Sequence, residues 1–279
     1  MRVLRAILAV FLVGITLAGC TAASVPAPKP SETSAAPTQA WPEAIGLVGL
    51  WRVSGVKDEA PETWLRLDAG EASLWRVCGV VDFSWAAQKG RFIAGLAGWN
   101  GCDTNGPPAV DWLVRVTGYA EDGNGWSLLD DKGVVVATLT IDGGPQPHPN
   151  RVASAAEPPE ITASTRYALR DPVALPSSLI PGDIEGRWIP EGFTGSTDPY
   201  VKFAPDAWTG SDGCNGQAGR WVSDPEGLFL ATSGAMTLIG CDNIDVGSWV
   251  AHARSVGFDG ETLVLLNANG AELGRLVRG

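Results

Sequence analysis

The chain contains two copies of one sequence pattern, and this repeat limits the folds open to it more than any other feature. Trp51 in GLWRVSG aligns with Trp188 in GRWIPEG at an offset of 137 residues. The spacing Cys-x6-Trp also occurs twice, beginning at Cys78 and at Cys214. Further matches follow in the same order, with offsets that stay between 136 and 139 residues. We therefore expect two copies of one domain.

Each copy has the pattern of short antiparallel strands with one helix. In the second copy the predicted elements are strands at 200–203, 220–222 and 228–231, a helix at 246–255 and a closing hairpin at 261–277. The chain has 35 glycines and 20 prolines, which favours many turns over long helices. A barrel hides strand edges from solvent. The predicted fold is thus mainly β, with two tandem small antiparallel barrel-like domains that each carry one short helix.

The amino terminus is typical of an exported protein. Arg2 and Arg5 form a positive region before an apolar stretch, 6–16, that is too short to cross about 30 Å of hydrocarbon as a helix. Leu-Ala-Gly-Cys follows and resembles the lipobox of bacterial lipoproteins. The resemblance implies cleavage after Gly19 and lipidation of Cys20. An ordinary secretory signal with a chance cysteine, or an uncleaved anchor, is the alternative.

These features divide the chain into five predicted segments. They are a lipoprotein signal peptide at 1–19, a disordered tether at 20–45, the first copy at 46–143, a linker at 144–181 and the second copy at 182–279. The tether is small, polar and rich in proline, which disfavours a packed core. The linker is also dense in proline, so we expect it to be extended and semi-rigid. Its part ITASTRYAL could pack on a domain as an edge strand.

Four cysteines remain once Cys20 is lipidated. An oxidising compartment favours disulfides, and two cysteines lie in each copy. We predict the pairs Cys78–Cys102 and Cys214–Cys241. Each closes a loop of about 25 residues, worth roughly 3 to 4 kcal/mol in the chain-entropy model. Metal binding is the alternative, but Cys-x-x-Cys does not occur and no histidine lies near a cysteine. We therefore expect no metal and no cofactor.

The formal net charge is -11. Cleavage would remove Arg2 and Arg5, which leaves 18 basic against 31 acidic residues and a net charge of -13. Nucleic-acid binding needs a basic face, so we expect no nucleic-acid partner. The charge also disfavours electrostatic attachment to anionic lipid, so the acyl chains would supply the membrane anchor.

The second copy resembles the META domain, also called HslJ-like. The residues that carry the resemblance are SDGCNGQAGRW (211–221), AMTLIGCDN (235–243) and the hairpin LNANGAELGRL (266–276), after a Trp-containing opening strand. The resemblance implies a small β-rich, barrel-like domain. The family is associated with envelope lipoproteins, stress response and antibiotic tolerance. It has no agreed catalytic activity, so no catalytic residue is carried over.

The first copy departs from the family pattern. It has Cys78-Gly79 where the second copy has Cys214-Asn215-Gly216, and it lacks the Asp-Gly that precedes Cys214. We therefore interpret the first copy as a diverged META-like domain. This departure leaves open whether the first copy keeps the role of the family.

Motifs of common catalytic sites do not occur in the sequence. The two histidines are His148 in the linker and His252 on the predicted helix, where a surface or half-buried position is the simpler interpretation. Gly-x-Ser-x-Gly, His-Glu-x-x-His and Ser-x-x-Lys are missing, and no glycine-rich phosphate loop precedes a lysine. We expect no catalytic residue.

Two acidic clusters have simple structural interpretations. Asp242 and Asp245 precede the predicted helix, where a carboxylate can cap free amides; a pair of calcium ligands is the alternative. Asp122-Gly123-Asn124-Gly125 lacks the ligand spacing of a calcium loop. We predict that it forms a hairpin turn.

Twelve tryptophans are unusually many for this length. Three of them in the first copy align with tryptophans of the second copy and are expected in the core. Trp64, Trp75, Trp99 and Trp126 have no clear aromatic counterpart. Exposed aromatic side chains can bind sugar or peptide faces, so these four form a possible binding surface, with packing as the default interpretation.

The sequence therefore predicts an extracytoplasmic, lipid-anchored envelope protein that acts by binding or shielding and does not catalyse a reaction. Its expected partners are the membrane, through acylated Cys20, and an envelope protein or cell-wall component. A carrier with a cavity inside one barrel, an extracytoplasmic hydrolase with paired carboxylates of raised pKa, and a purely structural spacer are the alternatives.

Overall fold

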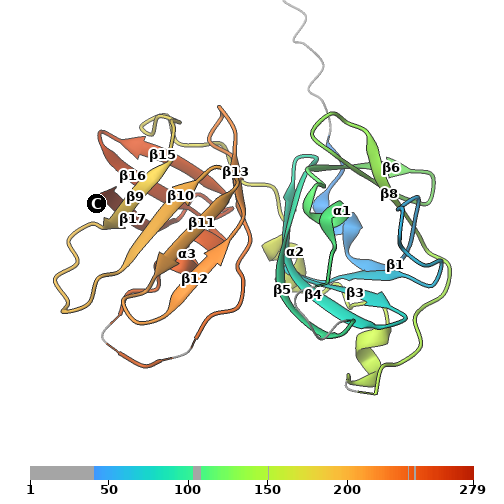
Figure 1. Ribbon diagram of the computed structural model, residues 1–279. Helices are drawn as coiled ribbons and strands as arrows, with labels where there is room; N and C mark the ends of the chain where they lie inside the picture. The colour runs from blue at the N-terminus through green and yellow to red at the C-terminus, as the bar shows by residue number, and fades with distance from the viewer. Residues whose placement is uncertain (1–40, 103–107, 150, 238, 242) are drawn as a thin grey trace, which may run out of the picture. The chain divides into compact units, whose positions relative to one another are not determined.

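The structure is a computed structural model (Figure 1) that describes residues 41–102, 108–149, 151–237, 239–241 and 243–279. Residues 40–279 form one compact unit. The predicted signal peptide, the predicted lipidation site Cys20 and the tether up to residue 40 lie outside the described residues. Within the described ranges, no helix is long and apolar enough to cross a membrane.

Eight antiparallel strands form a closed barrel in the first half (Figure 1). They are β1 (Gly49–Ser54), β2 (Trp64–Leu67), β3 (Glu71–Arg76), β4 (Gly79–Gln88), β5 (Arg91–Gly101), β6 (Gly118–Asp122), β7 (Gly125–Leu129) and β8 (Val135–Thr140). Neighbouring strands pair in chain order, and β1 also pairs with β8 through Val53 and Leu139. The two short helices of this half are η1 (Ala44–Leu47) and α1 (Asp111–Val114).

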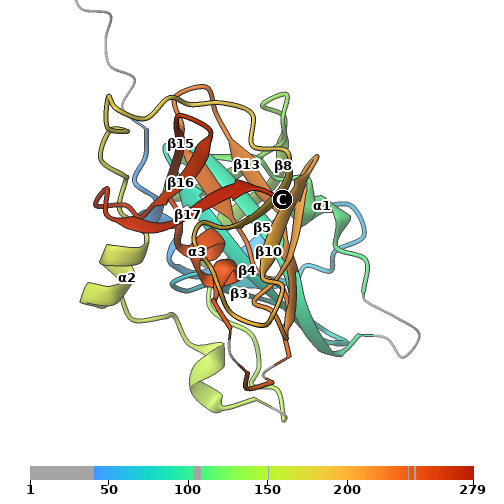
Figure 2. The same ribbon diagram turned by 90° about the vertical axis from the view of Figure 1, so that its left-hand side faces the viewer.

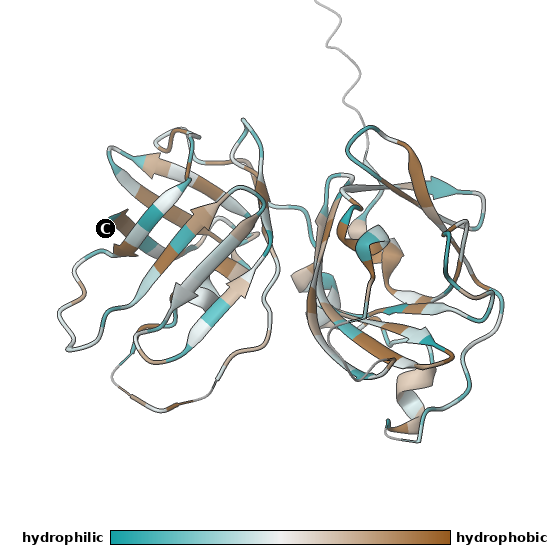
Figure 3. Ribbon diagram, viewed as in Figure 1, coloured by the Kyte–Doolittle hydropathy of each residue, from teal (hydrophilic) through white to brown (hydrophobic). Residues whose placement is uncertain are grey.

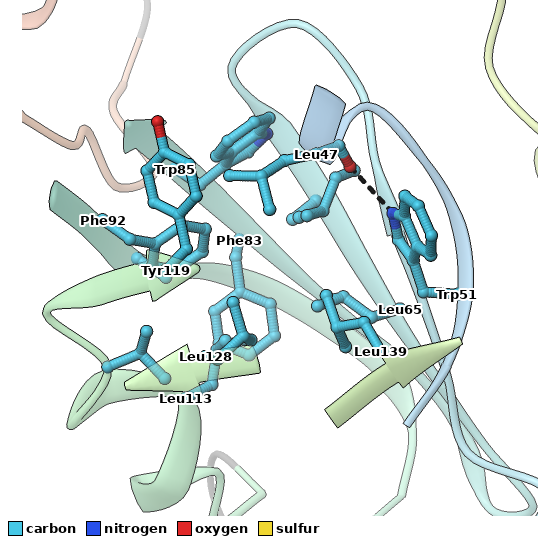
Figure 4. Close-up of a cluster of buried hydrophobic side chains, with 14 of the residues drawn as sticks. Leu47, Trp51, Leu65, Phe83, Trp85, Phe92, Leu113, Tyr119, Leu128 and Leu139 are labelled. Atoms are coloured by element: carbon cyan, nitrogen blue, oxygen red, sulfur yellow. Dashed lines mark hydrogen bonds between the residues drawn. The ribbon is translucent and has the colours of Figure 1, made fainter. Parts of the chain in front are cut away.

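Inward-facing side chains fill the barrel. Hydrophobic residues concentrate on its strands, whereas the turns are more hydrophilic (Figure 3). Phe83, Leu65 and Leu128 converge on the interior (Figure 4), and each is at most 2% exposed. At the start of β1, the indole Nε1 of Trp51 donates to the carbonyl of Leu47 over 2.8 Å, which holds η1 against the core. Because side chains occupy this space, a ligand of the first half must bind outside the barrel core.

The second half differs from the predicted barrel-like domain, because its described strands form an open seven-stranded sheet and a separate strand pair. Its strands are β9 (Gly186–Pro190), β10 (Tyr200–Ala204), β11 (Ala207–Ser211), β12 (Gly216–Gly219), β13 (Trp221–Ser223), β14 (Phe229–Ala231), β15 (Ser255–Asp259), β16 (Thr262–Leu266) and β17 (Glu272–Arg278). The sheet order is β12-β11-β10-β9-β17-β16-β15, and β13 pairs with β14. Helix α3 (Val246–His252) packs on β11, β14 and β17 (Figure 2).

The backbone explains why this half is split into two sheets. Strands β12 and β13 correspond to the single strand β4 of the first half. The break between them follows Gly219. A Cβ atom at Gly219 would lie 1.8 Å from the carbonyl oxygen of Thr232, so only glycine allows this approach. Beyond the strand pair, Leu228 forms a single bridge with Ser255.

Equivalent indole hydrogen bonds occur in the two halves. Trp188 Nε1 donates to the carbonyl of Ile184 over 2.7 Å, as Trp51 does to Leu47 at the matching position. Trp85 and Trp221 each donate to two backbone carbonyls that are also 136 residues apart between the halves. Buried indole N–H groups need an acceptor, so each half places its tryptophans with the same local contacts.

The structure confirms several predictions. The protein is mainly β, with large antiparallel sheets. The two disulfides join Cys78 to Cys102 and Cys214 to Cys241. The helix predicted at 246–255 is present but shorter: α3 (Val246–His252), in which Val250 is fully buried, ends because Ala253 has an extended backbone, and Ser255 already begins the next strand.

The linker differs from its prediction. The segment ITASTRYAL is not an edge strand: it contains helix α2 (Ala163–Ala168), because Thr162 and Thr165 form a capping box at its start. Upstream, the 3-10 helix η2 (Ala153–Ala156) packs on the outside of the barrel. The linker is thus partly folded onto the first half.

The two halves also contact each other directly. Ser84 Oγ donates to the carbonyl of Ser233, whose N–H donates back to Ser84 Oγ. Gln88 Nε2 donates to the carbonyl of Arg254 over 3.1 Å. A small apolar cluster surrounds these bonds, made of Ala86, Ile93, Leu228 and Leu230.

Candidate functional site

A cavity of about 1080 Å³ opens at one end of the barrel. It lies among the β1–β2 loop, the β3–β4 turn, helix α1 and the β7–β8 turn, all of which lie at the same end of the strands. The disulfide between Cys78 and Cys102 forms part of its wall. Trp112 of α1 separates the cavity from the filled core, because its ring packs into the core cluster and also lines the cavity.

A buried carboxylate organises the cavity wall. The side chain of Glu59 is only 5% exposed. It accepts two hydrogen bonds from the guanidinium of Arg76, one from Trp112 Nε1 over 2.8 Å and one from Thr63 Oγ1 over 3.2 Å. Bidentate pairing with arginine fixes the geometry of both side chains. Glu59 therefore ties the β1–β2 loop to β3 and to α1.

This network leaves Glu59 poorly suited to acid–base chemistry. A carboxylate has about four lone-pair positions, and Arg76, Trp112 and Thr63 account for them. A general base needs free access to the proton it removes. The arrangement instead supports a rigid wall.

The rim of the cavity is apolar and exposed. Val77 is 81% exposed, Val134 58% and Val135 53%. Charged residues of both signs line the same cavity: the basic residues are Lys57, Arg76 and Arg115, and the acidic residues are Asp58, Glu59, Asp111 and Asp130. Exposed apolar groups beside charges are typical of a binding site.

The matching position in the second half holds a different network. Asp212 aligns with Arg76 and is 2% exposed. Its carboxylate accepts from the backbone N–H of Cys214 and Asn215 and from the side-chain amides of Asn215 and Asn243. Asn215 in turn accepts from the backbone N–H of Ile239. The SDGCNG motif is therefore a turn that is anchored by the buried Asp212 and Asn215 and bonded to the disulfide-linked loop.

These bonds set the acidity of Asp212. Burial alone would raise the pKa of its carboxyl, but the hydrogen bonds from Asn215, Cys214 and Asn243 outweigh it and lower the pKa to about 2. The carboxylate is therefore ionised at neutral pH and holds the turn.

Three of the four tryptophans of the predicted aromatic surface are buried in this structure. Trp64, Trp75 and Trp126 are 4%, 4% and 7% exposed, whereas Trp99 is 44% exposed. Trp126 lies in the core, where its Nε1 donates to the carbonyl of Gly46. Trp64 and Trp75 lie outside the barrel under the linker. The sequence could not show this cover, because the covering residues lie about 80 positions away in the chain.

Other predicted sites have structural roles. Asp245 caps α3 by accepting from the N–H of Ser248, as expected; Asp242 lies outside the described residues. Residues 122–125 form the β6–β7 turn. His252 is exposed and its Nδ1 lies 2.9 Å from the carbonyl of Ser248. Among the described residues, no group of three potential metal-binding side chains occurs.

Sequence reasoning missed the cavity and its central carboxylate. Glu59 bonds to residues 17 and 53 positions away. No short motif contains these partners, so spacing along the chain offers no indication of them.

Comparison with known proteins found no matching family model, no similar curated protein and no similar solved structure. The resemblance to the META domain therefore stays a prediction.

Replacing Glu59 by Gln should destabilise the fold, because Arg76 would lose its charge partner in a largely buried setting. We expect a loss of about 2 to 3 kcal/mol in the free energy of unfolding, measured by chemical denaturation. Asp198→Asn is the control: it removes an ion pair to Arg187 that is far more exposed, and should cost less than about 1 kcal/mol. Equal effects of the two substitutions would contradict the role of Glu59.

Asp212 should make stability depend on acid pH. Its pKa in the folded state is about 2, below the ordinary value of 3.8, so its contribution is present above about pH 4 and is lost as pH falls through 2. Asp212→Asn should therefore cost about 2 kcal/mol at pH 7, and the difference from the native protein should shrink between pH 4 and pH 2. Urea titrations across this range measure it. Asp183→Asn, which changes an exposed carboxylate, is the control. A cost for Asp212→Asn that is independent of pH would refute the assignment.

Proposed function

We propose that this protein is a lipid-anchored envelope protein that binds an amphipathic ligand at the end of its first barrel. The observation that carries the proposal is the open cavity of about 1080 Å³ with its exposed valine rim beside charged residues of both signs. The rim suits an apolar group, and the charged residues of both signs suit a polar one. The two disulfides are compatible with an extracytoplasmic location.

The proposal includes two tandem META-like domains. Its support is the matching order of elements in the two halves, in which β1 to β8 correspond to β9 to β17 and α1 corresponds to α3. The recurring indole hydrogen bonds and the equivalent disulfides add to it. The halves differ at the cavity, because the position of Arg76 holds Asp212 in the second half. We infer that the second half keeps the family pattern and the first has diverged toward a ligand.

Binding is favoured over hydrolysis. The buried acid of the cavity, Glu59, is already paired with Arg76 and bonded to Trp112 and Thr63. A ligand carried inside the barrel is disfavoured, because the interior is filled by side chains. The proposed ligand therefore sits in the cavity at the end of the barrel, where an envelope molecule can reach it.

The anchor is tested by intact-mass analysis of the protein from its native membrane. We expect a mature chain that begins at acylated Cys20 and gains the mass of four hydrogen atoms when its two disulfides are reduced. Cys20→Ser should abolish acylation and leave both disulfides unchanged. An unmodified chain that begins at Met1 would refute the anchor.

The cavity is tested with the fluorescent probe 1-anilinonaphthalene-8-sulfonate, which combines aromatic rings with a negative charge. Val134→Asp should weaken its binding about tenfold, because covering a valine contributes about 1.5 kcal/mol and the new carboxylate repels the sulfonate. The matched control is Ile239→Asp, since Val134 and Ile239 are both 58% exposed and Ile239 lies outside the cavity. Fluorescence titration gives both affinities. Equal affinities of the two variants would contradict the proposed site.

A further inference from the structure

Four apolar side chains form a separate cluster on the outer face of the barrel. Leu50, Trp64, Trp75 and Val80 are at most 4% exposed, and they do not belong to the barrel core. Trp64 and Trp75 are direct cross-strand partners on β2 and β3. Successive residues of a strand face opposite sides of the sheet, so this cluster lies opposite inward residues such as Leu65. The barrel thus carries an aromatic face on its outside.

The fold itself does not need this face. The strand registers place Arg187, Tyr200, Ser211 and Gly216 at the four matching positions of the second half. All four are at least partly exposed to solvent. The matching strands of the second half thus leave this face partly exposed to solvent. We infer that the aromatic face has a role specific to the first half.

A short segment of the linker covers the aromatic face. Within this segment, 151–157, Ala155 and Ala156 pack on the cluster. Two polar contacts hold its ends: Arg151 pairs with Asp82, and Arg66 Nε donates to the carbonyl of Glu157 over 3.0 Å. The cover thus depends on two small side chains and on one ion pair with partly exposed members.

The segment covers the apolar surface of the face but offers no hydrogen-bond acceptor to its buried indole N–H group. Trp75 Nε1 is buried, and the described residues give it no hydrogen-bond partner. A buried indole normally finds an acceptor, and the alanine side chains over the cluster carry none. A ligand that brings an oxygen atom to this position would match the face better than the linker does.

The polar groups around the face indicate the class of ligand. The guanidinium of Arg52 lies 4.3 Å over the ring of Trp64. Asp82, which accepts from Ser73 Oγ, would have a free carboxylate oxygen if Arg151 moved away. Two adjacent indole planes beside a cation and a carboxylate match a sugar, whose C–H face packs on aromatic rings and whose hydroxyl groups both donate and accept hydrogen bonds.

We propose that Trp64 and Trp75 form a carbohydrate-binding face that the linker segment 151–157 covers when no saccharide is bound. The sugar displaces the segment, stacks on the two indoles and accepts a hydrogen bond from Trp75 Nε1. This site is separate from the cavity at the end of the barrel. It makes the linker a cover that competes with the ligand, so the affinity depends on the Arg151–Asp82 pair.

The test measures binding of a tetramer of β-1,4-linked N-acetylglucosamine by calorimetry, with the full exported chain. Arg151→Ala releases one end of the segment and should bind the tetramer about twofold to fivefold more tightly than the native protein, as expected from the loss of a partly exposed ion pair. Arg166→Ala, which removes an exposed arginine elsewhere in the linker, should bind like the native protein. Adding Trp75→Phe to Arg151→Ala keeps an aromatic ring, removes the N–H and should lower the affinity at least about fivefold.

Three outcomes would overturn the proposal. The first is that Arg151→Ala and the native protein bind the saccharide with the same affinity, or that neither binds it. The segment would then have only a structural role, even if Arg151→Ala lowers the melting temperature. Another is unchanged affinity after Trp75→Phe. A third is that Arg151→Ala binds a peptide with the sequence of 151–159 but not the saccharide, which would make the face a peptide site. The loss of probe affinity that Val134→Asp causes should be the same in all these variants, which separates this test from that of the cavity.

Discussion

The pairing of β1 with β8 closes the first half into a ring, and the other features of that half depend on this closure. A closed ring forces alternate residues either into a filled core or onto an outer surface. The core holds the strands in register, so the loops at one end meet around Glu59 and form the cavity. The outer surface receives Trp64 and Trp75. Both candidate binding regions are therefore products of one closed and rigid scaffold.

The two halves share local contacts but carry different surfaces. The buried indole bonds of Trp51 and Trp188 recur because they hold the core together. The positions that face solvent or the loops have diverged: Arg76 in one half matches Asp212 in the other. An ion pair to Glu59 builds the cavity wall in the first half, whereas a carboxylate surrounded by amides holds a turn in the second. Function is expected at the positions that differ, because the fold constrains them least.

The linker shows why exposure of an aromatic residue cannot be predicted from its own strand alone. Trp75 has no aromatic counterpart in the second half, whereas Tyr200 lies at the position that matches Trp64. The burial of both tryptophans depends on Ala155 and Ala156, which come from a segment whose composition suggested an extended spacer. Proline density describes only local stiffness. It does not show whether a segment lies on a neighbouring surface.

The sequence by itself determined the repeat, the two disulfides, the strands of the closing hairpin and helix α3, because each depends on spacing within a short stretch or on the pairing of cysteines within one copy. Only the tertiary structure decided that Glu59 meets Arg76 and Trp112, that the second half has an open sheet, and that the linker forms α2 and covers the outer tryptophans. These features depend on contacts between residues far apart in the chain. Such contacts depend on how the strands pair around the sheet and on where two backbone segments approach each other, as Gly219 and Thr232 do. No local sequence pattern encodes them.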